Sequence, residues 1–186
     1  MIVDSSALPE QVIDDVLTSS FQSAGQRCSA LRVLFVQEDV AARIIEMLEG
    51  AMAELVVGDP AMLKTDVGPV IDLEAKTMLE RHAERMRREA RLLCQAPLGP
   101  ATEHGTFVAP QAFEIDRIDR LEREVFGPIL HVIRYRADRL DQVIDAINAI
   151  GYGLTLGIHS RIDETVRHIS GRLRVGNAYV NRNMIG

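Results

Sequence analysis

The stretch Val33-Leu34-Phe35-Val36 decides the fold class, because it is apolar throughout and an amphipathic helical pattern follows it directly. From Asp39, a predicted N-cap, apolar residues recur at helical spacing until the turn residues Gly58-Asp59-Pro60 stop the helix. A strand that is apolar on both sides is typical of a parallel sheet buried on both faces. The pair therefore predicts a strand and a crossover helix of an α/β protein.

The same alternation continues toward both ends of the chain. Upstream, Pro9 predicts the first turn of a helix that leads into a polar loop. Downstream, Asp72 is expected to cap a long helix that reaches Leu93, with Cys94 at the end of its apolar face. Further strands are predicted at 107–115, 129–133, 154–159 and 175–180, and further helices at 140–147 and 162–169. We expect an α/β fold, a mostly parallel sheet with helices on both faces, in a single domain over residues 1–186.

Composition narrows the class of protein. The 186 residues are 47% hydrophobic and 26% charged, which is typical of a globular domain that forms a core without disulfides. A net charge of -6 argues against contact with nucleic acid, and no apolar run approaches the ~20 residues of a transmembrane segment. Two cysteines far apart, in a chain without a secretory leader, predict the reducing cytoplasm.

Cys28 is the first candidate for chemistry. It lies in the polar loop between the first predicted helix and the strand at Val33, and a thiolate is a strong nucleophile. The neighbouring Arg27 would stabilise the thiolate and lower its pKa. A free cysteine is more often a small buried hydrophobic residue, and the residues alone leave that alternative open. For Cys94 the core interpretation is the prediction.

Glu124-Val125-Phe126-Gly127-Pro128 is the second candidate. In extended backbone Glu124 and Phe126 share one face, so a carboxylate for ribose hydroxyls would stand beside a ring for a planar heterocycle. The alternative is a turn at a strand end with Phe126 in the core. No histidine or cysteine pair has metal-ligand spacing, so no metal site is expected, and His104 in a glycine-rich loop is a minor functional candidate.

Both motifs resemble those of one family. Gly25-Gln26-Arg27-Cys28-Ser29-Ala30 is similar to the nucleophile segment of NAD-dependent aldehyde dehydrogenases, and Glu124-Val125-Phe126-Gly127-Pro128 to their Glu-x-Phe-Gly-Pro cofactor motif. The residues around Cys28, from Ser20 to Arg32, further resemble the dehydrogenase part of the bacterial proline utilisation A enzymes. That branch oxidises glutamate semialdehyde, derived from pyrroline-5-carboxylate, to glutamate. The resemblance covers essentially the whole chain.

The resemblance implies a role for each matching residue. Cys28 would be the catalytic nucleophile, forming first a hemithioacetal with the aldehyde and then, after hydride transfer to NAD, a thioester that water hydrolyses. Glu124 would bind the nicotinamide ribose, and Phe126 would pack beside the nicotinamide. Arg27 and Ser29 would bind the α-carboxylate of the semialdehyde.

The resemblance also implies partners outside the chain. The family's general base, in a Glu-Thr-Gly-Gly segment, is expected just before Met1, the NAD-binding domain further upstream, and a Pro-Phe-Gly-Gly loop beyond Gly186. We therefore expect the catalytic domain of a larger, homo-oligomeric enzyme, inactive when isolated, with a small aldehyde as substrate. FAD would belong only to a proline-dehydrogenase part of that parent, which could associate peripherally with the inner membrane.

Two alternatives belong to other functional classes. The chain could be a non-catalytic interaction or assembly domain derived from an aldehyde dehydrogenase, since the general base and the nucleotide-binding domain lie outside it. It could also be a redox-sensing thiol protein built on Cys28, which would require a reactive thiol.

Overall fold

A seven-stranded sheet organises the chain in the computed structural model, which describes residues 1–185. Its strand order is β3-β4-β5-β2-β1-β6-β7, and every neighbouring pair is parallel except β3 and β4. The strands are β1 (Ile2–Val3), β2 (Val33–Gln37), β3 (Arg91–Gln95), β4 (Gln111–Glu114), β5 (Ile129–Tyr135), β6 (Thr155–His159) and β7 (Asn177–Val180). The predicted α/β class with a mostly parallel sheet is confirmed.

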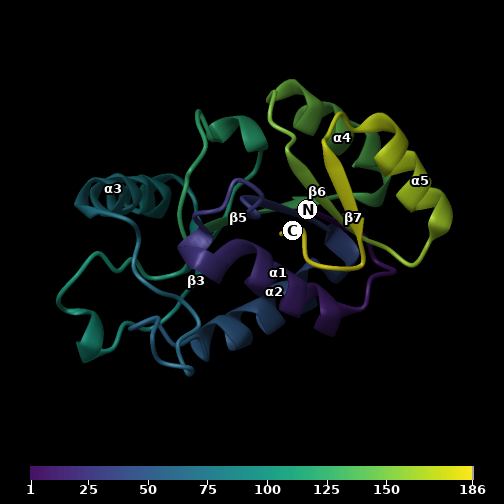
Figure 1. Cartoon of the computed structure of the whole chain (residues 1–186). Coiled ribbons are helices and arrows are strands. Elements are labelled where there is room, and N and C mark those ends of the chain that lie inside the picture. Colours follow the sequence, from purple (N-terminus) through teal and green to yellow (C-terminus); the bar gives the residue numbers. More distant parts are fainter. Residues whose placement is uncertain (186) are drawn as a thin grey trace.

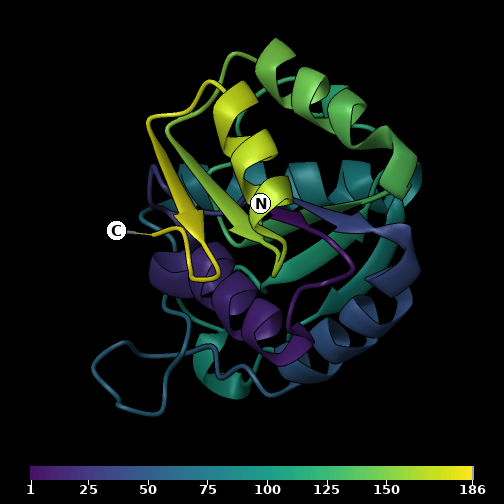
Figure 2. The same cartoon turned by 90° about the vertical axis from the view of Figure 1, so that its right-hand side faces the viewer.

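Helices cover both faces of the sheet, as Figures 1 and 2 show. The helices are α1 (Pro9–Phe21), α2 (Glu38–Ala53), α3 (Leu73–Glu89), α4 (Leu140–Ala149) and α5 (Asp163–Arg172). Helices α1 and α2 lie on one face, and α3, α4 and α5 on the other. The connection from β1 to β2, which contains α1, runs in one direction along the sheet, and the connection from β5 to β6, which contains α4, runs in the other. Because both crossovers are right-handed, α1 and α4 lie on opposite faces. Among residues 1–185, no helix is both long and apolar enough to cross a bilayer.

The shortest strand of the sheet, β1, lies next to the central strand β2. Ile2 and Val3 form β1, are fully buried, and pair with β2 on one side and β6 on the other. Three apolar residues at the start of a chain are too few to show a strand period, so only the neighbouring strands identify this element.

The long helix α3 begins where the sequence predicts but ends earlier. Asp72 caps it, since its Oδ1 accepts the main-chain N–H of Ala75 at 2.8 Å. The helix stops at Glu89 because Ala90 is extended and the next residues pair as the antiparallel edge strand β3 with β4. The predicted extension to Leu93 is therefore wrong, because sheet pairing with a distant strand outweighs the local helical pattern.

Two smaller predictions concern single residues. Cys94 lies on β3, not at a helix end, and its half-buried sulfur packs 3.1 Å from that of Met52, so its core role is confirmed. Burial raises the pKa of this thiol to about 12. Asp39 is not an N-cap: α2 begins one residue earlier, at Glu38, and the carboxylate of Asp39 accepts the side-chain amide of Gln37 instead.

Candidate active site

The loop that carries Cys28 leaves α1 through a strained turn. Ser23, Ala24 and Gly25 are consecutive residues with φ of 55°, 52° and 65°, the left-handed region that costs a side chain about 1 kcal/mol or more. This turn reverses the chain, which then passes Cys28 and enters β2 at Val33. Cys28 is exposed, so the loop presents its thiol beyond the amino end of the strand.

The second motif enters the neighbouring strand β5 in the same way. Val125 is buried, whereas Glu124 and Phe126 on either side of it are exposed, as the alternation of extended backbone requires. Phe126 is 37% exposed, so the alternative that it fills the core is wrong. Because β2 and β5 are parallel neighbours, both motifs lie at the same edge of the sheet.

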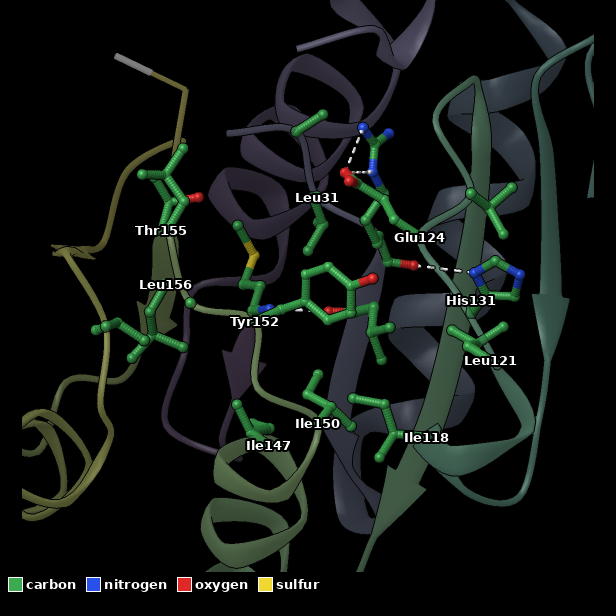
Figure 3. Close-up of a pocket in the computed structure, with 18 of the residues that line it drawn as sticks. Leu31, Ile118, Leu121, Glu124, His131, Ile147, Ile150, Tyr152, Thr155 and Leu156 are labelled. Atoms are coloured by element: carbon green, nitrogen blue, oxygen red, sulfur yellow. Dashed lines mark hydrogen bonds and ion pairs between the residues drawn. The ribbon is translucent and has the colours of Figure 1, made fainter. Parts of the chain in front are cut away.

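A cavity of about 620 Å³ joins the two motifs (Figure 3). Cys28, Glu124 and Phe126 line it, although 96 positions separate the first two. Most of the remaining wall is apolar and comes from the sheet, the end of α4 and the segments before β5 and β6; it includes Leu31, Val33, Phe35, Leu121, Ile150, Tyr152 and Leu156. The cavity lies toward the amino ends of the strands, opposite to the edge where open α/β sheets usually bind ligands.

Two glycines bring the motifs into contact. A Cβ on Gly25 would lie 2.3 Å from the carbonyl oxygen of Gly127, and one on Gly127 would lie 2.4 Å from Cδ1 of Leu79. The clash at Gly25 is with backbone, and Gly25 also has a positive φ, whereas the clash at Gly127 is with the end of a side chain on α3. Glycine at position 25 therefore sets how closely the loop of Cys28 approaches the motif from Glu124 to Pro128, and glycine at position 127 lets Leu79 pack against that motif.

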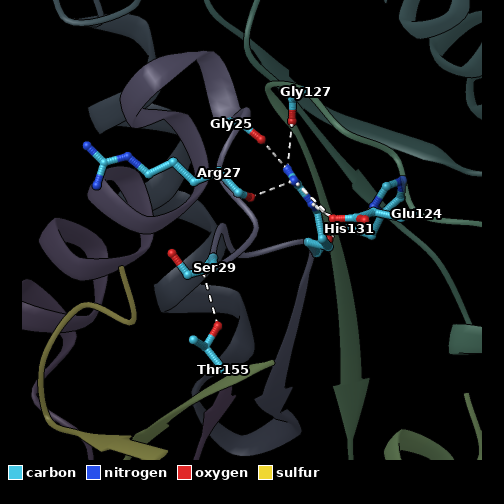
Figure 4. Close-up of polar contacts among 8 residues, drawn as sticks. Gly25, Arg27, Ser29, Glu124, Gly127, His131 and Thr155 are labelled. Atoms are coloured by element: carbon cyan, nitrogen blue, oxygen red, sulfur yellow. Dashed lines mark hydrogen bonds and ion pairs between the residues drawn. The ribbon is translucent and has the colours of Figure 1, made fainter. Parts of the chain in front are cut away.

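Arg32 connects the same segments through hydrogen bonds (Figure 4). Its guanidinium donates to the carbonyl oxygens of Gly25, Arg27 and Gly127, and forms an ion pair with Glu124 at 3.2 Å. Burial lowers the pKa of Arg32, and Glu124 acts in the opposite direction. In the sequence Arg32 is only the last residue of the segment that begins at Ser20, because a pattern along the chain does not show contacts with residue 124.

The structure places Arg27 and Ser29 beside Cys28 but not on the cavity wall as the described residues define it. The Nε–H of Arg27 donates to the hydroxyl of Ser23 at 3.0 Å, and in Figure 4 the side chain points away from Glu124 and Gly127. The hydroxyl of Thr155 donates to the carbonyl oxygen of Ser29 at 3.2 Å, which connects the loop of Cys28 to β6. Their role in binding a carboxylate stays a prediction.

A pair of histidines lies next to the cavity. The Nε2 atoms of His82, on α3, and His131, on β5, are 2.9 Å apart, and Nδ1 of His131 lies 3.1 Å from the carbonyl oxygen of Arg32. Since a carbonyl only accepts, His131 carries its proton on Nδ1, and His82 donates through Nε2. Burial lowers the pKa of His82 to about 4 and that of His131 to about 3, so both are neutral. Sequence patterns missed this pair, which 49 positions separate. His104 lies elsewhere, exposed in its loop.

Comparison with known proteins gives the family of this chain. The aldehyde dehydrogenase family matches the chain over residues 1–186. The chain belongs to the aldehyde dehydrogenase family. Within the family, the bifunctional protein PutA of Klebsiella aerogenes is 56% identical over 191 aligned residues, 100% of this chain and 15% of that protein.

Two further relatives extend this comparison. The 1-pyrroline-5-carboxylate dehydrogenase of Geobacillus kaustophilus (strain HTA426) is 31% identical over 188 residues, 100% of this chain and 36% of that protein. A crystal structure of a bifunctional proline utilization A (PutA) protein superposes with a TM-score of 0.94 and 58% identity. That superposition covers 99% of this chain and 18% of the other. The chain thus spans well under half the length of the relatives it matches.

Proposed function

We propose that this chain is the nucleophile-bearing catalytic domain of an NAD-dependent dehydrogenase that oxidises L-glutamate γ-semialdehyde to glutamate in proline catabolism. The observation that carries the proposal is that Cys28, Glu124 and Phe126 line one cavity. The names of the matching relatives, bifunctional PutA proteins and 1-pyrroline-5-carboxylate dehydrogenases, supply the substrate class. We further propose that the parent is cytoplasmic and, if it is bifunctional like these relatives, holds FAD in its other enzymatic part.

Cys28 would supply the covalent step. Its thiolate attacks the aldehyde carbon, and a carbon–sulfur bond forms while the carbonyl π bond breaks. The negative charge that develops on the oxygen needs a donor, and the main-chain N–H of Cys28 is available there. NAD, when bound, would supply the acceptor for the hydride of that carbon. Water would then attack the thioester carbon and break its bond to sulfur, which releases the product as a carboxylate and returns the thiol of Cys28.

Glu124 and Phe126 fit the nicotinamide end of NAD. Both hydrogen bonds from Arg32 reach Oε1 of Glu124, and within the described chain no donor reaches Oε2. That second oxygen is free to accept ribose hydroxyls, as the chemistry of a diol requires. Phe126 offers a partly exposed ring against which a flat heterocycle packs. These residues would hold one end of the cofactor, while the rest would bind a domain supplied by another part of the parent.

Arg27 and Ser29 would receive the α-carboxylate of the semialdehyde. Among contacts within residues 1–185, Arg27 uses only Nε, so its two terminal nitrogens are available for a bidentate bond to a carboxylate. To make this bond, either the side chain of Arg27 turns from Ser23 toward the cavity, or the substrate carboxylate extends toward Arg27.

The remaining machinery would come from the longer polypeptide. A general base contributes about 10² to 10⁴ in rate, and the family's base lies in a segment outside this chain. We therefore propose that residues 1–186 alone are inactive, and that the NAD-binding domain and the oligomer contacts belong to the rest of the parent. Measurable NAD reduction by the isolated 186-residue polypeptide would contradict this part of the proposal.

The decisive test replaces Cys28 in the full natural polypeptide that carries this chain. Cys28→Ser should abolish NAD-dependent oxidation of glutamate semialdehyde, whereas Cys94→Ser, the control thiol on β3, should retain it. Proline oxidation by a bifunctional parent should stay near normal in both variants. Unchanged semialdehyde oxidation in Cys28→Ser would refute the nucleophile, and an inactive wild-type parent would favour the interaction-domain alternative.

A further inference from the structure

We propose that Arg32 is a positioning residue, whose one side chain holds both the nucleophile loop and the cofactor carboxylate in their working arrangement. The inference rests on the proposed function, because it concerns how Cys28 and Glu124 are kept in register with each other. Arg32 touches neither a reacting atom nor, in this arrangement, the substrate; it acts through the groups that it binds.

The guanidinium of Arg32 has partners on both sides of the cavity mouth. On the nucleophile side it donates to the carbonyl oxygens of Gly25 and Arg27, the latter at 3.1 Å. On the cofactor side it donates to the carbonyl oxygen of Gly127 at 3.3 Å and to Glu124. Its side chain is 14% exposed, so these partners compensate for the loss of water around a charge.

The contact with Glu124 fixes the orientation of the carboxylate. Nε and Nη2 of Arg32 both donate to Oε1, each at 3.2 Å, so the two bonds hold one oxygen and turn the other outward. The guanidinium also lies 4.8 Å from the centroid of the Phe126 ring, within the range of a cation–π interaction. One cation thus positions both side chains assigned to the cofactor.

The main chain of Arg32 is held as firmly as its side chain. Its carbonyl oxygen accepts two hydrogen bonds from His131, one from the main-chain N–H at 3.0 Å and one from Nδ1 at 3.1 Å. His131 is fully buried, and its Nε2 accepts from His82 on α3. The main chain of Arg32 is therefore fixed relative to β5, and the fold determines which groups its guanidinium can contact.

The pattern of partners calls for arginine specifically. Three carbonyl oxygens and a carboxylate surround the group, and a planar guanidinium offers five N–H donors in fixed directions. A lysine has three donors on a single nitrogen and cannot reach all four acceptors together. Lysine at position 32 would keep the positive charge but lose some of the hydrogen bonds to the three carbonyl oxygens and the carboxylate.

The test uses Arg32→Gln and Arg32→Lys in the full natural polypeptide. Two quantities are measured. The first is the KM for NAD in semialdehyde oxidation, with kcat determined in the same assay. The second is the rate at which iodoacetamide alkylates Cys28 in the absence of NAD. Arg134→Gln is the control, because Arg134 also pairs with a carboxylate, that of Glu114 at 2.6 Å, but near the opposite end of β5.

For Arg32→Gln we expect KM for NAD to rise and the alkylation rate to change, each by about 10-fold or more. Arg32→Lys should fall between Arg32→Gln and wild type. In a Glu124→Gln background, Arg32→Gln should raise KM by no more than about two-fold further, because the carboxylate that it orients is gone. Arg134→Gln should lower the unfolding temperature without moving either quantity.

Folded Arg32→Gln protein with both quantities within about two-fold of wild type would overturn the proposal. So would a change in only one of them, since the proposal assigns both to a single side chain. If Arg32→Gln does not fold, Arg32→Lys decides by the same criterion. A wild-type parent without semialdehyde dehydrogenase activity would refute the proposed function instead, and the alkylation rate would still show whether Arg32 positions the loop.

Discussion

Gly25 and Gly127 lie so close that a methyl group on Gly25 would come within 2.3 Å of the carbonyl oxygen of Gly127. The first belongs to the strained turn before Cys28, and the second belongs to the motif that contains Glu124 and Phe126. Contact between two main chains is stiffer than contact between side chains, because no rotamer can relieve it. The positions of Cys28 and Glu124 are therefore linked through backbone.

Gly25→Ala should weaken both stability and activity. Alanine at φ 65° costs about 1 kcal/mol, and overpacking against backbone adds about 1 to 3 kcal/mol. We expect the free energy of unfolding of residues 1–186 to fall by at least about 2 kcal/mol in urea titrations. Gly50→Ala, on α2 with open space around it, is the control and should not destabilise. Equal stability of Gly25→Ala and wild type would contradict the close approach.

Gly127→Ala should be rescued in part by a second substitution. A Cβ at position 127 would meet the side chain of Leu79, not backbone, so the clash is removable. Leu79→Ala alone costs about 2 to 5 kcal/mol as a fully buried residue. In a double-mutant cycle measured by chemical unfolding, Gly127→Ala plus Leu79→Ala should lose less than the sum of the two single losses. Strict additivity would show that the two residues do not touch.

Glu124→Gln should affect cofactor binding more than folding. The change removes a charge that would accept ribose hydroxyls and breaks an ion pair that is partly exposed and so contributes at most about 1 kcal/mol to stability. We expect the KM for NAD of the full polypeptide to rise by about 10-fold. Glu46→Gln, exposed on α2, serves as the control. A KM equal to that of wild type would remove Glu124 from the cofactor site.

Stability should fall as the pH drops below about 6.5. His131 and His159 are buried, and burial lowers their pKa values to about 3 and about 4, below the unfolded value of 6.5. Between these values the unfolded chain binds protons that the folded chain does not, so the free energy of unfolding decreases with decreasing pH. Each histidine should contribute roughly 1 kcal/mol between pH 7.5 and 5.5.

The measurement is urea unfolding at pH 7.5 and 5.5. His159→Leu removes one of these groups and should reduce the difference between the two pH values by about one histidine's share. A free energy of unfolding that is the same at both pH values would contradict the assignment of neutral, buried histidines. The chosen range stays above the pKa of most carboxylates, so their titration contributes little.

Asp72→Ala should destabilise more than Asp39→Ala. Asp72 accepts the main-chain N–H of Ala75 at the start of α3, and loss of an N-cap costs about 1 kcal/mol. Asp39 looks equally suited in sequence but lies inside the first turn of α2, where it caps nothing. The difference between the two unfolding free energies tests the observed helix starts, and a larger loss for Asp39→Ala would reverse them.

The sequence alone determined the fold class and indicated the residues that we propose for the chemistry. Apolar strands and amphipathic helices have different periods, and these periods survive in any one-dimensional pattern. The motif around Cys28 and the motif from Glu124 to Pro128 are likewise contiguous, so they are visible without a structure. Their assignment to the aldehyde dehydrogenase family is confirmed over the whole chain.

Only the tertiary structure decided how these pieces meet. The parallel pairing of β2 with β5 brings Cys28 and Glu124 to one cavity, and the end of α3 at Glu89 depends on β4, which lies beyond the helix in sequence. Arg32 and the His82–His131 pair have partners tens of positions away, and no local period reports such contacts. A contact between distant residues costs loop-closure entropy, and the packing of the whole sheet offsets this cost. The contact therefore exists only once the sheet has formed.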